Sequence, residues 1–590
     1  MNSELAKIFN EMAALLDIKH VAFKPRAYEL AASSIEALNE DVKEIYKKGS
    51  STHSTSSGQA GSPQGGLRAL EAIPGVGRGI AEKIEEYIKT GHIKEYTKLK
   101  KELPVDIAGL TKIEGVGPQT VKKLYKNLKV KNVSDLEKAI KKGLLVAKGG
   151  FSKKSEERIL KSLDFLKIGH GRYYLGEILP IARSIIEKIR TFPGVEHAEY
   201  AGSLRRMQET VGDLDILVTS KSPAKVMDYF VKMPRVVEVT AHGMSRSAVR
   251  LDLGIHADLR VIPPESFGAA LQYFTGDKQH NIALRELAIK KGYKLNEYGL
   301  WKVTRNKRQE TMMAGKTEKE IYEKLGMDWM SPELRTNNGE IEAALSGKLP
   351  KLIGYDDIKG DLQVQSDWTD GDNSIRELAE AAKKFGLEYI AITDHTQALA
   401  MTGGNDEKRL LKQMGEIDKI NKTLSGIKVL KGVEVDIKKD GSLDIEDEVL
   451  AQLDVVGASV HSYFNLLETD QTKRIIRAME NPHVDILFHP TGRIVGRREA
   501  YKIDIDAIIK AAKRTKTVLE ANGSNRLDLK DEYIRRAIAA GVKIAIDSDA
   551  HSVDQFDFLE YGIAQARRGW CEKRDVINTR KWQDMLKLLK

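Results

Sequence analysis

Residues 201–218, AGSLRRMQETVGDLDILV, combine side chains that bind metal ions with groups that bind phosphate. Asp213 and Asp215 stand two positions apart at the start of an apolar run, so period-two alternation along a strand places both carboxylates on one face. Two adjacent oxygen ligands at the mouth of a strand suit Mg²⁺ or Mn²⁺. A third carboxylate, Asp258, follows in the strand-like run HADLRVIP and shares a face with Arg260. The three carboxylates predict a two-metal site.

The Gly202-Ser203 turn ahead of these carboxylates offers backbone N–H groups to a phosphate, and Arg205 and Arg206 add charge-assisted donors. A bare Asp-x-Asp is more often an ordinary acidic strand end. Joined to the turn before it and to Asp258 after it, the motif instead predicts the phosphoryl transfer of a nucleotidyltransferase.

The elements around this site follow from the spacing of apolar residues. A helix is predicted over residues 175–190, leading into the sheet that carries the carboxylates. After the sheet, Tyr273-Phe274-Thr275-Gly276 precedes a helix with Asn281 and Arg285 one turn apart on one face. The aromatic pair fits a core position, whereas the glycine break and the polar groups after it fit a contact surface for base pair and sugar. The pattern leaves both interpretations open.

Two segments of similar pattern lie nearer the N-terminus, IPGVGRGIAEKI (residues 73–84) and IEGVGPQTVKKLY (residues 113–125). In each, a Gly-x-Gly turn feeds a lysine-bearing helix, and such a turn can present free N–H groups to one phosphate without contacting a base. One Gly-x-Gly is weak evidence, because glycine is common in tight turns. Two copies in the same frame predict a helix-hairpin-helix grip on nucleic-acid backbone through Gly75, Gly77, Gly115 and Gly117.

From residue 356 onward, strand-like apolar runs alternate with helices, the pattern of an α/β barrel with functional residues at the C-terminal ends of its strands. Several histidines interleaved with carboxylates predict a multinuclear site for Zn²⁺ or Mn²⁺, and a vestigial polar cluster is the alternative. The strand-end residues are Asp394, His395, Glu434, His461, His489, Asp549 and His551.

The chain of 590 residues is 41% hydrophobic and 31% charged, which fits a globular protein of about three to five domains. A formal net charge of +10, with lysines concentrated before residue 167, favours a polyanionic partner and salt-sensitive binding. Cys571 is the single cysteine, and neither a signal-peptide pattern nor a membrane-length apolar run is evident, so we expect a cytoplasmic protein. The uncharged, Ser/Gly-rich segment 50–66 is expected not to pack.

Together these motifs resemble the family X DNA polymerases over residues 1–350 and the polymerase and histidinol phosphatase (PHP) domain over residues 355–590. The combination is similar to the bacterial and archaeal family X polymerases with a C-terminal PHP domain. The resemblance implies a multidomain α/β protein of five parts: a helical DNA-binding domain (1–90) that contains the insert 50–66, a helix-hairpin-helix fingers-like domain (91–170), a nucleotidyltransferase palm with a mixed sheet (171–266), an α/β thumb-like nucleotide-selection domain (267–350) and a (β/α) barrel-like PHP domain (355–590).

The resemblance also implies roles for single residues. Asp213, Asp215 and Asp258 would bind two Mg²⁺ ions, and Asp258 would help to activate the primer 3′-hydroxyl. The nucleotide and DNA contacts would be Ser203, Arg206 and Gly212 to the triphosphate, Tyr273, Phe274 and Gly276 to the sugar, and Asn281 and Arg285 to the minor groove and the template. Lys24 matches a phosphate-binding lysine, and Lys83 matches the Schiff-base lysine of a 5′-deoxyribose-phosphate lyase. A solvated, phosphate-contacting Lys83 is the alternative.

The PHP half departs from the family pattern, because Gln363 and Gln365 stand where the family has His-x-His. A glutamine carbonyl is a weaker metal ligand than imidazole. Seven expected ligands remain: Asp370, His395, Glu434, His461, His489, Asp549 and His551. An intact domain would supply 3′–5′ exonuclease and apurinic-site endonuclease activities, so we expect weak or altered nuclease activity here.

The leading interpretation is a monomeric, template-directed polymerase that fills short gaps in DNA repair, with gapped or primer–template DNA and deoxynucleoside triphosphates as partners. A non-templated transferase is one alternative, and the paired Gly-x-Gly turns and residues 273–276 argue against it. In two further alternatives the PHP domain is the working nuclease and the front half targets it to DNA, or the PHP domain only steadies the polymerase.

Overall fold

The computed structural model describes residues 2–19, 21, 24–36, 41–51, 63–73, 75–111, 113, 116–153, 155–156, 159–160, 172–303, 310–399 and 402–590. The chain divides into two compact units, Met1–Ile168 and Gly169–Lys590. Among the helices of these described residues, none combines the length and the apolar content that crossing a membrane requires.

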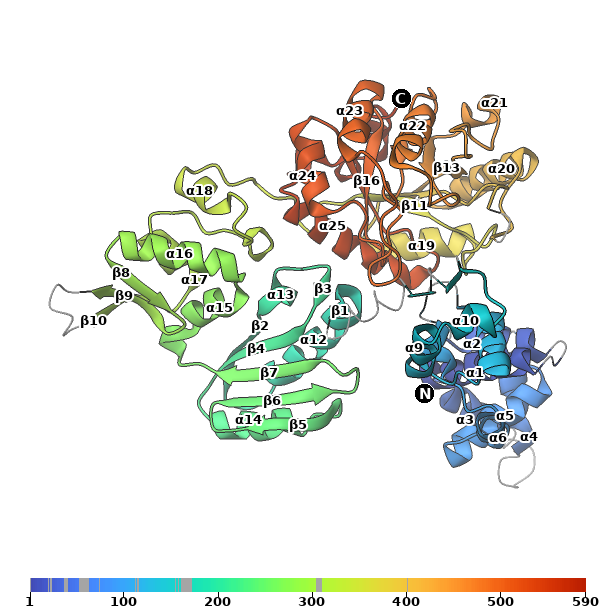
Figure 1. Ribbon diagram of the computed structural model, residues 1–590, viewed down its shortest axis with the longest axis horizontal. Coiled ribbons are helices and arrows are strands. Elements are labelled where there is room, and N and C mark those ends of the chain that lie inside the picture. The colour runs from blue at the N-terminus through green and yellow to red at the C-terminus, as the bar shows by residue number, and fades with distance from the viewer. Residues whose placement is uncertain are drawn as a thin grey trace. The chain divides into compact units, whose positions relative to one another are not determined.

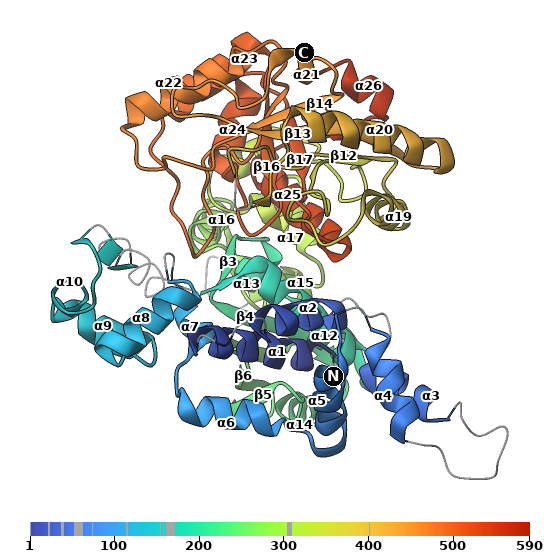
Figure 2. The same cartoon turned by 90° about the vertical axis from the view of Figure 1, so that its right-hand side faces the viewer.

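The first unit, called the helical unit below, packs amphipathic helices around one core that includes Leu5, Phe9 and Ile84. The two ends of the Ser/Gly-rich segment 50–66 belong to helices, contrary to expectation, and residues 52–62 lie outside the described part of the chain. The helices are α1 (Asn2–Ile18), α2 (Lys24–Glu36), α3 (Val42–Ser51), α4 (Pro63–Glu71), α5 (Arg78–Thr90), α6 (Lys94–Glu102), α7 (Ile107–Thr111), α8 (Pro118–Leu128), α9 (Val133–Lys141) and α10 (Leu144–Ala147) (Figures 1 and 2).

The second unit contains a mixed five-stranded sheet in the order β2-β4-β7-β6-β5, and β4 lies parallel to β7. Helices α12 (Leu175–Arg190) and α14 (Pro223–Val231) share a core with Leu214, Ile216 and Val218 of β4. Alternation along β4 therefore turns Asp213 and Asp215 to the opposite face. The strands are β2 (Val195–Tyr200), β4 (Asp213–Ser220), β5 (Val236–His242), β6 (Arg246–Leu251) and β7 (His256–Val261), and β1 (Tyr173–Tyr174) pairs with β3 (Thr210–Val211) beside them.

A smaller antiparallel sheet follows, in the order β10-β9-β8. Its strands are β8 (Tyr293–Asn296), β9 (Gly299–Val303) and β10 (Glu310–Ala314), and it packs with α15 (Phe267–Thr275), α16 (Lys278–Lys290), α17 (Glu318–Lys324) and α18 (Glu340–Leu345). The buried Arg335 binds Glu318 through Nη1 at 2.5 Å, and Glu318 also binds Arg205 of the short helix α13 (Gly202–Arg205), which follows β2 of the five-stranded sheet, at 2.7 Å. This ion-pair network joins the two sheets.

The C-terminal part is a nearly closed barrel of seven parallel strands in sequential order, β11 to β17. The backbone N–H of Gln365, just after β11, donates to the carbonyl of Ala550, just after β17, at 2.8 Å, which brings the first and last strands together. Alternate strand residues face a core beneath the outer helices or a core inside the barrel. The strands are β11 (Gly360–Val364), β12 (Tyr389–Ile392), β13 (Lys428–Asp436), β14 (Val455–Ser459), β15 (Ile486–Leu487), β16 (Val518–Asn522) and β17 (Ile544–Asp547).

Helices α19 (Ile375–Phe385), α20 (Glu407–Thr423), α21 (Asp447–Leu450), α22 (Glu468–Met479), α23 (Ile505–Thr515), α24 (Asp531–Ala539), α25 (Phe558–Arg568) and α26 (Trp582–Leu586) accompany the barrel strands (Figure 2). The predicted fold class is thus confirmed: a helical N-terminal region, mixed sheets and a C-terminal α/β barrel.

Candidate functional site

The three predicted carboxylates of the five-stranded sheet lie on two neighbouring parallel strands. Asp215 of β4 stands directly opposite Asp258 of β7, and Asp213 stands opposite His256. Arg246, on β6, donates to Asp258 Oδ2 from Nε at 2.8 Å and from Nη2 at 2.6 Å. The guanidinium of Arg260 lies on the other side, with its Nε 3.3 Å from Asp258 Oδ1. Negative charge is therefore concentrated here and only partly neutralised.

The protonation of Asp215 reports this concentration of charge. Burial, followed by the charges of Asp213 and Asp258, raises the pKa of Asp215 to about 7. Asp258 Oδ1 is buried and accepts no hydrogen bond from any described residue. Neighbouring carboxylates of which one is largely buried favour a divalent cation, and their oxygen donors suit Mg²⁺ or Mn²⁺.

The Gly-Ser turn lies directly against these carboxylates. Gly202 has φ +64°, and a Cβ there would come within 2.8 Å of Asp215 Oδ2, so only glycine fits without displacing the carboxylate. The backbone N–H of Ala201 donates to the carbonyl of Asp215 at 2.9 Å. Ser203, next to Gly202, and Gly212, which directly precedes β4, are both half-buried.

The two arginines after the turn have different surroundings. Arg205 is held by Thr275 and by both carboxylate oxygens of Glu318, so it serves the ion-pair network between the sheets instead of facing a phosphate. Arg206 donates to the carbonyl of Thr275 through Nη1, while its buried Nε has no partner among the described residues. Burial lowers the pKa of Arg206, as expected for a cation short of counter-charge.

The segment after α15 meets Arg206. A Cβ on Gly276 would lie 3.4 Å from Arg206 Nη1, and Gly276 has φ +64°. Tyr273 and Phe274 are half-buried and stack edge-on at 5.2 Å, so neither is a fully buried core residue. Asn281 donates to the carbonyl of Tyr273 at 2.7 Å, and Arg285 is exposed one turn further along α16. The structure thus brings Tyr273, Phe274, Gly276 and Asn281 together beside Arg206.

In the helical unit, Gly77 and Gly117 are the N-cap residues of α5 and α8, and no side chain caps either helix. Both glycines are exposed, and a Cβ on either would meet nothing within 4 Å. Gly75 has φ +76°, and Gly115 lies outside the described residues. The backbone N–H groups at these helix starts are available to an anion.

Lys24 and Lys83 converge on one carboxylate, Glu95 of α6. Lys83 Nζ lies 2.9 Å from Glu95, and the more exposed Lys24 Nζ lies 3.8 Å from it. Burial lowers the pKa of Lys83, but Glu95 and Tyr28 outweigh it and leave the pKa raised. A lysine held as an ammonium group is suited to bind phosphate and is a poor nucleophile.

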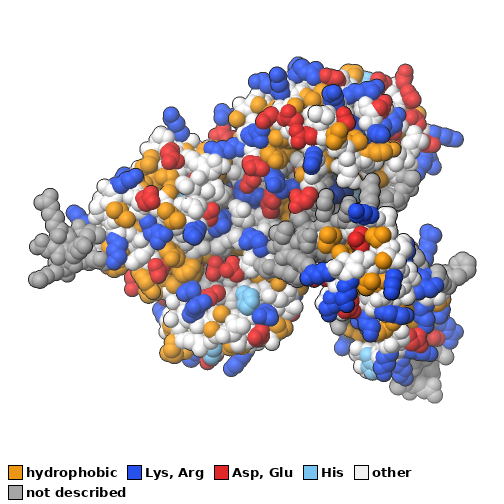
Figure 3. Space-filling model, in the orientation of Figure 1, with side chains coloured by type: hydrophobic (Ala, Val, Ile, Leu, Met, Phe, Trp, Pro, Cys, Tyr) orange, Lys and Arg blue, Asp and Glu red, His pale blue; other side chains and the backbone are white. Residues whose placement is uncertain are grey.

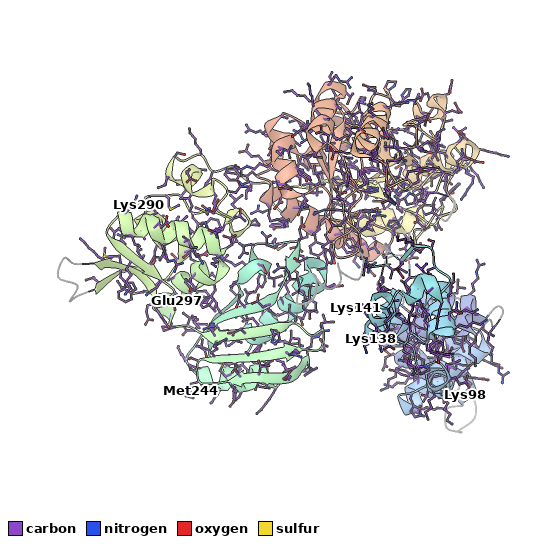
Figure 4. The ribbon with its side chains drawn as sticks, in the orientation of Figure 1. Lys98, Lys138, Lys141, Met244, Lys290 and Glu297 are labelled. Atoms are coloured by element: carbon purple, nitrogen blue, oxygen red, sulfur yellow. The ribbon has the colours of Figure 1, made fainter. Side chains whose placement is uncertain are left out.

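Exposed lysines cover much of the helical unit. Lys98 of α6 and Lys138 and Lys141 of α9 project outward (Figure 4), and Lys and Arg side chains are frequent on the visible face of this unit (Figure 3). Such a surface suits contact with a polyanion.

The seven predicted metal ligands of the barrel form one connected cluster around Glu434. His489 Nε2 lies 2.8 Å and His461 Nε2 3.1 Å from Glu434 Oε1, and His395 Nδ1 lies 3.5 Å from Oε2. Asp370 and Asp549 extend the cluster through His395 and His551. Ligand atoms lie within 4.8 Å of one another in two groups: Asp370, His395 and His551, and His395, Glu434 and His461. Both groups supply nitrogen and carboxylate donors of the kind that Zn²⁺ and Mn²⁺ accept.

The histidines of this cluster affect the protonation of the carboxylate at its centre. Burial would raise the pKa of Glu434, but the neighbouring His395, His461 and His489 lower it well below its usual value. Burial lowers the pKa of His395. The carboxylate at the centre thus stays ionised and able to ligate a cation.

Gln363 and Gln365 are fully buried at the expected His-x-His positions. Gln365 Nε2 donates to Glu434 Oε2 at 2.8 Å, and its Oε1 is buried without a partner among the described residues. Gln363 Oε1 accepts from Asn522 Nδ2 at 3.0 Å. The carboxamides of Gln363 and Gln365 therefore stand, hydrogen-bonded to their neighbours, where two imidazoles would ligate a metal ion.

Sequence reasoning missed several residues at both clusters. Arg246 lies in an alternating strand without a motif, and only the register of β6 against β7 brings it to Asp258. Glu520, Asn522 and Arg526 surround Asp549 in the barrel, with Asn522 at 3.2 Å and Arg526 at 3.3 Å from Asp549 Oδ2. The strand-end run TVLEANG carries the same signal as the other barrel strands. Asp394, in contrast, accepts hydrogen bonds from Ser366, Thr369 and Gln413, which gives this carboxylate a structural role.

Family models match four stretches of the chain. A helix-hairpin-helix domain matches residues 1–93, a SAM-like helix-hairpin-helix tandem residues 107–164, the DNA polymerase beta thumb residues 270–336 and the PHP domain residues 361–529.

Curated proteins are similar over the whole chain or over parts of it. The DNA polymerase/3′-5′ exonuclease PolX of Bacillus subtilis is 36% identical over 596 residues, which cover 100% of this chain and 99% of that protein. A DNA polymerase lambda of Arabidopsis thaliana is 27% identical over 45% of this chain and 53% of its own length. A probable phosphatase of Thermoanaerobacter sp. is 35% identical over 35% of this chain and 84% of its own length.

Proposed function

The chain belongs to the family X DNA polymerases with a C-terminal PHP domain, and we propose that it fills short gaps in DNA by two-metal phosphoryl transfer at Asp213, Asp215 and Asp258. The observation that carries this proposal is the register of β4 against β7, which sets Asp215 opposite Asp258 beneath the Gly202 turn. The matches to the polymerase beta thumb and to full-length PolX support it.

Asp213, Asp215 and Asp258 would hold Mg²⁺ or Mn²⁺, which supplies charge neutralisation for the triphosphate and a more acidic primer hydroxyl. The chain's own residues then position the reactants. Asp258, oriented by Arg246, faces the incoming primer end, and the Gly-Ser turn and Gly212 offer backbone N–H groups to the triphosphate. Little covalent chemistry remains for the protein, so positioning sets the rate.

Selection of the nucleotide is assigned to the neighbouring segment. Arg206, with its unpartnered Nε, would bind the triphosphate, and Tyr273, Phe274 and Gly276 would line the sugar position. Asn281 would contact the nucleotide, and Arg285, exposed on α16, would contact the template. Their closeness to Arg206 supports this assignment.

DNA contacts in the helical unit are assigned to Gly75, Gly77, Gly115 and Gly117 and to Lys24 and Lys83. The protonated state of Lys83 supports phosphate binding over Schiff-base formation. The partners are gapped or primer–template DNA and deoxynucleoside triphosphates, and the working form is a monomer that acts in DNA repair in the cytoplasm.

Template dependence tests the proposed polymerase. A 5′-labelled primer on a one-nucleotide gap is incubated with each nucleotide singly, opposite each of the four template bases. Extension by the complementary nucleotide only is the expected result. Equal extension with all nucleotides, or extension of single-stranded primer alone, would instead indicate a non-templated transferase.

For the PHP domain we propose a weakened 3′–5′ exonuclease and apurinic-site endonuclease. The retained groups around His395 support metal binding, and the hydrogen bond from Gln365 to Glu434 supports weakening. The alternative is a PHP domain that only supports the polymerase, and Gln363 and Gln365 favour it because neither side chain is a strong metal ligand.

A gain-of-function variant distinguishes the two. Gln363→His/Gln365→His should bind more Zn²⁺ or Mn²⁺ per chain than the wild type and shorten a labelled primer faster without nucleotides. His395→Ala/Asp549→Ala is the matched loss variant. No metal in the wild type and no shortening in any variant would leave the domain as a support alone.

A further inference from the structure

The segment 207–212 connects the turn that carries Ser203 and Arg206 to the strand that carries Asp213 and Asp215. On one side the segment is held by the short pair β1–β3, by a hydrogen bond from Leu175 N to the carbonyl of Glu209 at 3.0 Å and by Arg172, which donates to Thr210 Oγ1 at 2.9 Å. Met207 and Val211 of the segment are buried in the core of the five-stranded sheet. Any displacement of this segment would move nucleotide-binding and metal-binding residues together.

Three side chains of the barrel hold this segment from the other side. Arg493 donates to Glu209 Oε1 at 2.6 Å and to Oε2 at 3.1 Å, and Gln565 donates to Oε1 at 2.9 Å. Arg568 lies 3.5 Å from Glu209 and donates to the carbonyl of Met207. Burial would raise the pKa of Glu209, but Arg493 and Arg568 outweigh it and lower the pKa to about 2.

These barrel side chains are themselves firmly placed. Arg568 Nε binds Asp531 at 2.9 Å, and both Arg493 and Gln565 donate to the carbonyl of Leu527. Leu527 is fully buried in the hydrophobic core of the five-stranded sheet, together with Tyr561 and Ala564 of α25. The barrel therefore contributes both apolar and charged groups to the support of this segment.

The same stretch of barrel chain continues into the PHP cluster. Ser524, whose carbonyl accepts from the Tyr174 hydroxyl at 3.0 Å, also bonds Asn522 at 2.6 Å. Asn522 in turn bonds Gln363 and Asp549. A continuous path of contacts thus joins the barrel cluster to the start of α12 and to segment 207–212.

We propose that Arg493, Gln565 and Arg568 of the PHP barrel are positioning residues for the polymerase, acting through Glu209 to place the nucleotide-binding turn and the catalytic strand. The proposal rests on the proposed function of that site and assigns the barrel a part in nucleotide binding that does not require its own metal. The carboxylate of Glu209 is the single group on which the three side chains converge.

Nucleotide binding by the full-length protein tests the proposal, on gapped DNA whose primer ends in a dideoxynucleotide so that no turnover occurs. The values of KM and kcat are measured on the same DNA with an extendable primer. Glu209→Ala should raise both the Kd for the complementary nucleotide, measured calorimetrically, and the KM about tenfold, because loss of the clamp lets the turn move. The value of kcat should fall less than threefold. Glu209→Gln, which keeps the side-chain volume, should restore much of the binding. Arg493→Ala, which removes the partner that donates to both oxygens of Glu209, should also raise Kd and KM and serves if the Glu209→Ala variant fails to fold.

The control removes a different contact between the same two domains. Glu560, on α25, binds Arg183 of α12 at 2.7 Å, away from segment 207–212. Glu560→Ala should leave Kd and KM within twofold of the wild type. A double variant, Glu209→Ala/Arg493→Ala, should bind nucleotide no more weakly than Glu209→Ala alone. Each of the two substitutions removes the same ion pair between Glu209 and Arg493.

Two results would overturn the inference: an unchanged nucleotide Kd in Glu209→Ala, or an equal rise in Glu560→Ala. A wild type that binds nucleotide normally but does not extend the primer would refute the proposed function and leave this inference standing, because the Kd is measured without turnover.

Discussion

Asp215 and Asp258 face each other across parallel strands, and burial, followed by the charges of Asp213 and Asp258, raises the pKa of Asp215 to about 7, so ionising all three carboxylates together is costly. Arg246 partly relieves that cost from β6. The carboxylates could be predicted because an Asp-x-Asp at a strand start is a local pattern. Arg246 could not, because its closeness to Asp258 depends on strand pairing, which a single strand does not reveal.

Removal of the Arg246 charge should strengthen metal binding. In Arg246→Gln the carboxylate of Asp258 loses its guanidinium partner, so a divalent cation meets less competing positive charge. We expect the Mn²⁺ dissociation constant, measured by calorimetry, to fall several-fold. Arg250→Gln, on the same strand and paired with Glu238, is the control, and an unchanged or higher constant in Arg246→Gln would contradict the expectation.

At the scale of elements, the sequence predicts the Gly-x-Gly turns. In the first turn, the structure gives a different reason for glycine at each of the two positions. Gly75 has φ +76°, and a Cβ there would meet Leu30 at 2.9 Å. Gly77 has ordinary backbone angles at the start of α5, with open space around it. The ends of segment 50–66 could not be predicted as helical, because composition alone argued for a loop and packing against α5 and the rest of the core decided otherwise.

Alanine at these two positions should therefore act on different properties. Gly75→Ala should lower the free energy of unfolding of the helical unit by about 1 kcal/mol or more, because alanine is strained at positive φ. Gly77→Ala should lower stability only by the smaller preference of an N-cap for glycine over alanine, roughly 0.5 kcal/mol. It should also weaken binding to gapped DNA, because a methyl group then stands beside the exposed N–H groups. Thermal unfolding and fluorescence anisotropy measure the two effects, and equal DNA affinity in Gly77→Ala would argue against a phosphate contact there.

His280 of α16 gives the three-stranded sheet a pH dependence. It is fully buried between Glu340 and Tyr322, and burial lowers its pKa below 6.5. Its folded pKa lies below the unfolded value, so its contribution to stability is present above about pH 6.5 and is lost as pH falls toward the folded pKa. The Tm difference between wild type and His280→Gln should shrink from pH 8 to pH 5.5. A constant difference would contradict this account.

At the scale of the whole molecule, the succession of a helical region, mixed sheets and a C-terminal α/β barrel could be predicted, because each has its own local pattern. The contact between the five-stranded sheet and the barrel could not be predicted from the sequence. Glu209 and Arg493 are separated by 284 positions, and although Glu209 lies within residues 201–218, nothing in the pattern there distinguishes it as a contact to a distant domain. Leu527 reads as an ordinary apolar residue after a barrel strand, yet it completes the core of another domain.

Templated synthesis is proposed for the carboxylates of β4 and β7. The test is single-turnover extension of a labelled primer on a one-nucleotide gap by the Asp258→Asn variant. The control variant is Asp252→Asn, because Asp252 is an exposed aspartate after β6 that pairs with Arg235. The account predicts a loss of about a thousandfold or more in Asp258→Asn and a change within twofold in Asp252→Asn. Extension by Asp258→Asn within tenfold of the wild-type rate would contradict it.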